Sequence, residues 1–102
     1  MTQKTSAAVQ SRVIVMPARV TFADGSEFRK KLFGALEGQT NQLMINLSET
    51  IFMDSAGLGM LLVALKECNN RGVSLVLSSP KGEVLKLLEL TRSNERFQIL
   101  QA

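Results

Sequence analysis

Strand-like and helix-like segments alternate along this chain, and that alternation limits the possible fold more than any other feature of the sequence. Runs rich in β-branched or alternating apolar residues predict strands, whereas apolar residues three and four positions apart predict helices. The predicted strands cover residues 12–20, 42–47, 73–77 and 97–100. The predicted helices lie between them and begin near Asp24-Gly25-Ser26, Asp54-Ser55 and Ser79-Pro80. This order predicts one α/β domain over residues 1–102, with a mixed, mostly parallel β-sheet and helices packed against it.

The connections between these elements carry their own signals. Pro17 removes a backbone donor from the first predicted strand, so we expect that strand to end or bulge there. Residues 48–53 are expected to form a short connection that leads to Asp54-Ser55. Ser79 is predicted to be an N-cap followed by Pro80 at the first helical position. Residues 1–8 are polar enough to be a frayed start or a weak edge strand.

The composition excludes several classes of function. The chain has 12 basic and 9 acidic residues, no His and one Cys, so an internal disulfide is impossible and His-based catalysis is excluded. Zinc and other transition metals normally need Cys or His ligands, so we expect no metal site and no cofactor. The basic residues do not cluster, which disfavours nucleic-acid binding. Cys68 is expected to pack as a small apolar side chain.

The sequence shows no membrane signal. No apolar run approaches the roughly 20 residues that cross a bilayer. Residues 1–10 are polar and lack the apolar stretch of a signal peptide. We therefore expect a cytoplasmic protein.

The most informative stretch is residues 46–62, NLSETIFMDSAGLGMLL, in which a predicted strand leads through a short loop into a helix. Asp54 and Ser55 are both good N-caps, and whichever of them caps, the other lies beside free backbone N–H groups at the positive end of the helix dipole. A phosphate on Ser55 would be tolerated there electrostatically. Capping alone would also explain an Asp-Ser pair, so the residues by themselves leave both interpretations open.

The turn that follows carries almost no side chains. Ala56, Gly57 and Gly59 would let the surface of another protein approach the backbone and the Ser55 hydroxyl closely. Each glycine costs roughly 1 kcal/mol in a helix relative to alanine, so two of them call for an explanation. Close packing of the helix on a strand is the alternative explanation.

The run FMDSAGLGMLL resembles the signature of the STAS family, which is named for sulphate transporters and anti-sigma-factor antagonists, and the resemblance covers roughly residues 10–100. It implies that Ser55 is a phosphate acceptor and that Asp54 supports the loop at a partner interface. Where the family often has Gly and an acidic residue after its second strand, this chain has Ala18 and Thr21. The resemblance thus implies the following partner-binding residues: Thr21, Asp54, Ser55, Ala56, Gly57, Leu58 and Gly59.

The function implied by the resemblance is that of an anti-sigma factor antagonist, a protein-binding regulator of transcription or of a related bacterial process, and not an enzyme. In this scheme the unphosphorylated chain, a monomer when free, binds an anti-sigma factor that is also a serine kinase. Phosphorylation of Ser55 releases it, and a serine phosphatase resets the switch. ATP and Mg²⁺ belong to these partners, because the chain has no phosphate-binding glycine motif.

Three alternatives stay open at this stage. A constitutive STAS scaffold would dock an ATPase in a lipid-transport complex without a phosphate. A ligand-sensing STAS module would need a large apolar pocket, and a filled core would oppose it. An enzyme would have to use a lone Ser without His, which is a poor nucleophile arrangement.

Overall fold

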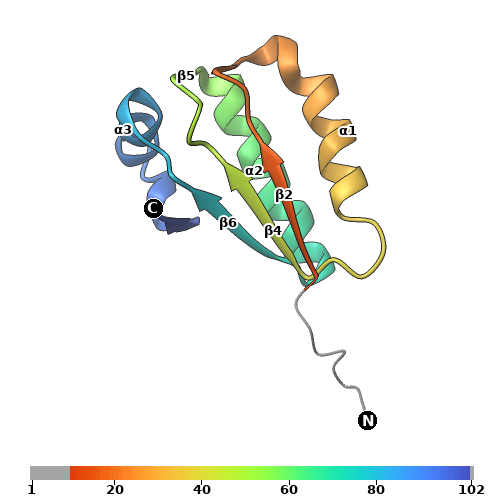
Figure 1. Cartoon of the computed structure of the whole chain (residues 1–102). Helices are drawn as coiled ribbons and strands as arrows, with labels where there is room; N and C mark the ends of the chain where they lie inside the picture. Colours follow the sequence, from red (N-terminus) through yellow and green to blue (C-terminus); the bar gives the residue numbers. More distant parts are fainter. Residues whose placement is uncertain (1–9, 102) are drawn as a thin grey trace.

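A four-stranded parallel sheet forms the centre of the domain (Figure 1). The structure, a computed structural model, describes residues 10–101, so the expectation for residues 1–8 lies outside the described part. The strands are β2 (Ser11–Val15), β4 (Gln42–Asn46), β6 (Ser74–Ser78) and β7 (Gln98–Leu100), in the order β2-β4-β6-β7. Each neighbouring pair of these strands is parallel, which confirms the predicted α/β fold with a mostly parallel sheet.

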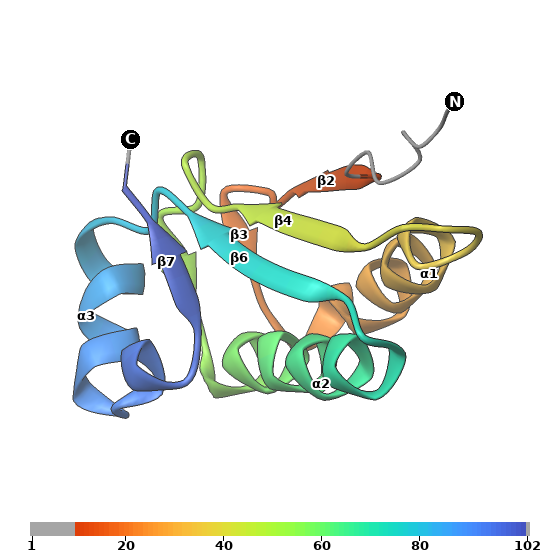
Figure 2. The same cartoon turned by 90° about the horizontal axis from the view of Figure 1, so that it is seen from below.

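The helices are α1 (Gly25–Ala35), α2 (Ser55–Arg71) and α3 (Gly82–Leu90), with short 3₁₀ turns η1 (Phe22–Asp24) and η2 (Ser93–Glu95). Figure 2 shows α1 and α2 side by side against one face of the sheet, with α3 near β7. Within residues 10–101, every helix is too short or too polar to cross a membrane.

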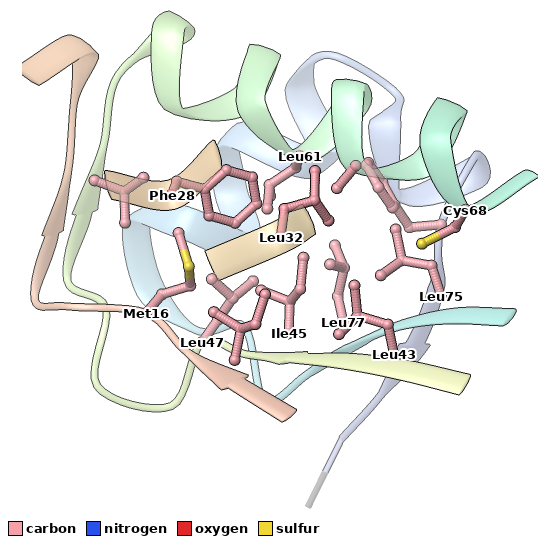
Figure 3. Packing of buried hydrophobic residues seen from close by; sticks show 14 of the residues in the cluster. Met16, Phe28, Leu32, Leu43, Ile45, Leu47, Leu61, Cys68, Leu75 and Leu77 are labelled. Atoms are coloured by element: carbon pink, nitrogen blue, oxygen red, sulfur yellow. The ribbon is translucent and has the colours of Figure 1, made fainter. Parts of the chain in front are cut away.

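The core lies between the sheet and the two helices on its face (Figure 3). Leu43, Ile45 and Leu47 alternate along β4 and its end, and none of these side chains is exposed. Leu32 and Leu61 meet them from the helices and are also fully buried. The side chains that alternate along the predicted strand and those spaced three to four residues apart in the predicted helices therefore pack in one apolar layer.

Pro17 divides the predicted first strand into two pieces that belong to different sheets. After β2 the chain passes Pro17 and forms β3 (Arg19–Val20), which pairs with β5 (Phe52–Met53) in a separate two-stranded parallel sheet. Pro17 has no N–H to continue the ladder with β4, so the break was expected. The predicted short connection over residues 48–53 ends in the two-residue strand β5, which the sequence did not predict.

The predicted start of the third helix was also wrong. The N-cap of α3 is Lys81, and the helix begins at Gly82. Ser79 has a left-handed backbone with φ of 58°, and its N–H donates to the Leu100 carbonyl at 2.8 Å. Pro80 lies outside the helix because residues 79–80 are bound to the end of β7, and the Gln101 side chain donates to the Pro80 carbonyl.

Candidate functional site at the start of α2

The loop before α2 is fixed to the segment that follows Pro17. The Thr50 side chain is fully buried, and its hydroxyl donates to the Pro17 carbonyl at 2.9 Å, which satisfies a polar group that would otherwise be costly to bury. The Arg19 guanidinium lies over the Phe52 ring at 4.6 Å. Two neighbouring strands and a buried hydrogen bond thus position the residues that begin α2.

Asp54 is the N-cap of α2. Its backbone is extended, its Oδ1 atom accepts from the Gly57 N–H at 2.7 Å, and its carbonyl accepts from the Leu58 N–H. Its Oδ2 atom accepts a longer hydrogen bond, 3.4 Å, from the Phe22 N–H. One carboxylate therefore fixes the helix start and ties it to η1. Of the two capping candidates in the sequence, Asp54 is the cap.

Ser55 is the first residue of the 17-residue helix α2, and its side chain is exposed. Among residues 10–101 its hydroxyl has no hydrogen-bond partner within the protein. It stands at the positive end of the helix dipole, where unpaired N–H groups favour an anion. The expectation that this hydroxyl is open to solvent is confirmed; its phosphorylation stays a prediction.

Gly57 and Gly59 are required for different reasons. Gly57 is buried, and a Cβ atom there would lie 2.5 Å from the Val20 carbonyl oxygen and 2.7 Å from the Met53 Cγ atom. Gly57 therefore allows α2 to contact β3 and β5. At Gly59 a Cβ atom would meet nothing within 4 Å, so no internal contact requires a glycine. The packing explanation holds for Gly57, and the surface explanation remains for Gly59.

The other two predicted residues of this turn are less accessible than Ser55. Leu58 is 8% exposed and belongs to the core cluster, so its side chain faces inward. Ala56 is half-buried. The exposed part of the predicted partner-binding set is thus centred on Ser55, with Gly59 one turn further along the helix.

Thr21 is half-buried and lies near the site through η1, of which it is the N-cap. The Asp24 carboxylate accepts from the Thr21 N–H at 2.8 Å and from its hydroxyl at 3.2 Å. The next residue, Phe22, donates to Asp54. The structure therefore brings the Thr21 segment and the start of α2 together, although 32 positions separate Phe22 from Asp54.

Phe22 was not predicted to belong to the site. Its side chain is 82% exposed and lines a surface groove between α1 and α2. This is the apolar pocket that bears on the ligand-sensing alternative. It is open to solvent along Phe22 and Val63, whereas the domain interior is filled by core side chains.

Cys68 lies toward the other end of α2 and its side chain is fully buried, as the sequence predicted. Burial raises the pKa of the Cys68 thiol, an effect that the nearby Arg71 charge partly opposes. A buried, protonated thiol is a poor nucleophile, so Cys68 is a core residue. Within residues 10–101, no group of three or more Cys, Asp or Glu side chains is arranged to hold a metal ion.

The family model "STAS domain" matches residues 3–101, so this chain belongs to the STAS family.

Two solved structures and one sequence relative illustrate the range of the family. A candidate anti-sigma factor antagonist from Thermotoga maritima is 27% identical, has a TM-score of 0.77, and aligns over 88% of this chain and 80% of its own. The anti-sigma factor antagonist SpoIIAA in its unphosphorylated form has a TM-score of 0.71, with 93% of this chain and 83% of SpoIIAA covered. At 20% identity that likeness shows the fold alone. "Sulfate transporter 3.1" from Arabidopsis thaliana is 35% identical over 74 residues, which are 72% of this chain but 11% of the plant protein.

Proposed function

We propose that this chain is an anti-sigma factor antagonist whose binding to an anti-sigma factor with serine-kinase activity is switched off by phosphorylation of Ser55. The observation that carries the proposal is the exposed Ser55 hydroxyl at the first residue of α2, directly after a carboxylate that already caps the helix. The likeness to anti-sigma factor antagonists in fold supports the same class of function.

The switch follows from charge and desolvation. A phosphate adds about −1.5 to −2 charges at pH 7. Because Asp54 is adjacent and its carboxylate is held in place, the new charge lies beside a negative charge in any interface that covers Ser55. An unpaired buried charge costs several kcal/mol, and each 1.4 kcal/mol is a tenfold change in affinity. A loss of about 10² to 10³ in affinity therefore needs no change of fold.

The proposal also assigns the remaining roles. ATP and Mg²⁺ are bound by the kinase, and a serine phosphatase removes the phosphate and restores binding. This chain contributes a binding surface and an acceptor hydroxyl, and no catalytic residue. Thr21, Ala56 and Gly59 lie at the edge of the same surface, and buried Gly57 and Leu58 hold it in position.

The test is a titration of this chain against each anti-sigma-type serine kinase encoded in the same genome, measured by calorimetry with ADP present. We expect wild type and Ser55→Ala to bind one kinase with similar affinity, within about threefold, because the hydroxyl is not needed for docking. Ser55→Asp adds one negative charge beside Asp54 and should weaken binding at least tenfold.

The result that would contradict the proposal is equal affinity of the three proteins for the kinase, or no binding to any of the kinases. A scaffold that docks an ATPase constitutively would give a different result. It would bind its ATPase without a kinase, and Mg-ATP would leave Ser55 unmodified in the complex.

A further inference from the structure

An apolar groove of about 470 Å³ lies between α1 and α2. Its floor is formed by the buried side chains of Phe28 and Leu32, and its α2 wall by Met60 and Val63. Phe22 forms the rim at one end. Two of the groove's apolar residues are strongly exposed, Phe22 at 82% and Val63 at 43%, so solvent covers apolar surface here in the free chain.

The two ends of the groove have different neighbours. Beyond Leu32 the Arg71 guanidinium lies over the Phe33 ring at 5.4 Å and pairs with Glu67 at 3.5 Å, which fills the space between the ends of the two helices. At the end near the start of α2, the Phe22 N–H donates to the Asp54 carboxylate that caps the helix. The groove therefore lies next to the helix start that carries Ser55.

The groove has a charged edge on its α1 side. Arg29 lines the groove and is exposed, and it forms neither of the ion pairs found among residues 10–101, which are Arg71–Glu67 and Arg92–Glu95. A partner that fills the groove with apolar side chains gains a further contact if it carries a carboxylate opposite Arg29.

We propose that this groove docks an amphipathic helix of the serine kinase, with its apolar face on Phe22, Met60 and Val63 and an acidic residue at Arg29. This rests on the proposed function and deepens it, because it gives the kinase a docking surface separate from the hydroxyl that it modifies. An amphipathic helix laid in an apolar groove is a common mode of recognition, and it keeps the polar face of the helix in water.

Two other occupants fit the observations less well. A small apolar ligand is usually enclosed over most of its surface, whereas this groove is open along Phe22 and Val63. A second copy of the chain joined by a two-fold axis would bring the same patch of both copies together. Each copy in such a dimer would contribute its own Arg29, so the interface would carry two positive charges from these side chains.

The experiment measures binding of the kinase identified by the Ser55 titration, with ADP as the only nucleotide so that no phosphate is transferred. Phe22→Ala and Val63→Asp should each raise the Kd at least tenfold, because they remove or charge the apolar surface at the centre of the contact. Arg29→Glu should raise it about fivefold. Leu100→Ala is the matched control, because Leu100 is also exposed, at 53%, but lies on β7. The Kd of this variant for the kinase should stay within twofold of the wild-type value.

The outcomes separate this inference from the proposed function. If wild type binds the kinase and both groove variants bind equally well, the docking inference is overturned while the Ser55 switch stands. If wild type binds no kinase, both fail. If light scattering instead shows a dimer that Val63→Asp dissociates, the groove belongs to a second copy and the inference is wrong. Thermal unfolding followed by circular dichroism checks each variant, and Phe22→Ala, at an exposed position, keeps the test valid should Val63→Asp fail to fold.

Discussion

Ser55 and Ser79 lie at two junctions where a strand leads into a helix. In the sequence both are serines at the predicted start of a helix. Ser55 is the first residue of α2, its side chain is exposed, and the preceding Asp54 carboxylate caps the helix. Ser79 lies three residues before α3, is half-buried, has a left-handed backbone, and is hydrogen-bonded through its N–H to Leu100. Of these two serines, only Ser55 therefore combines an exposed side chain with a helix cap supplied by another residue.

The largest change in stability is expected from a substitution that disrupts the close contact between α2 and β3. Gly57→Ala puts a Cβ atom against the Val20 backbone oxygen, which cannot move as a flexible side chain would. We expect a loss of about 2–3 kcal/mol in the free energy of unfolding, measured by urea denaturation. A loss below about 0.5 kcal/mol would show that α2 does not depend on this close contact.

The second-largest change in stability is expected at the N-cap of α2, in comparison with the N-cap of α3. Asp54→Ala removes the acceptor of the Gly57 and Phe22 N–H groups, and we expect it to cost about 1–2 kcal/mol of stability. The matched variant Lys81→Ala should stay within about 0.5 kcal/mol of wild type, because the Lys81 side chain makes no capping hydrogen bond. Equal losses in urea denaturation would remove the distinction between the two junctions.

Gly59→Ala should have the opposite sign to Gly57→Ala. The added methyl group meets open space, so the gain in helix propensity should stabilise the chain by about 0.5–1 kcal/mol. If a partner covers this turn, the same variant should bind the kinase more weakly than wild type. Increased stability with unchanged affinity would place the interface elsewhere.

The smallest effect lies at the far end of α2, where the environment is apolar. Burial raises the pKa of the folded Cys68 thiol above its value in the unfolded chain. The stability that comes from the protonated thiol is complete below the unfolded pKa and is lost as pH rises above it, by less than about 1.4 kcal/mol per pH unit. The stability difference between wild type and Cys68→Ala should therefore shrink between pH 8 and pH 10 in urea denaturation; a difference that grows with pH would contradict this.

The layered fold and the position of the site could be predicted because they depend on local patterns. The alternation of Leu43, Ile45 and Leu47 gives the buried face of β4, and Asp54 followed by Ser55 gives the start of α2. Both signals lie within a few residues of the feature they predict. The family resemblance supplied the roles assigned to these residues.

The features that could not be predicted depend on contacts between distant segments. Residues 79–80 are held by the end of β7, so the local N-cap pattern was overridden. β5 has only two residues and exists because β3 lies beside it. The Phe22 backbone is hydrogen-bonded to Asp54, 32 positions away, and nothing near Phe22 in the sequence shows that its side chain is exposed. Gly57 and Gly59 look equivalent in the sequence and differ only in what lies beside them.

The most direct test of the account is to incubate the chain with its kinase and Mg-ATP, map the modified residue by mass spectrometry, and measure the affinity of the product for the same kinase. The account predicts one phosphate, on Ser55 and not on Ser79, and an affinity about 10² to 10³ lower than that of the unmodified chain. Phosphate on another residue, or an affinity that the Ser55 phosphate leaves unchanged, would contradict it.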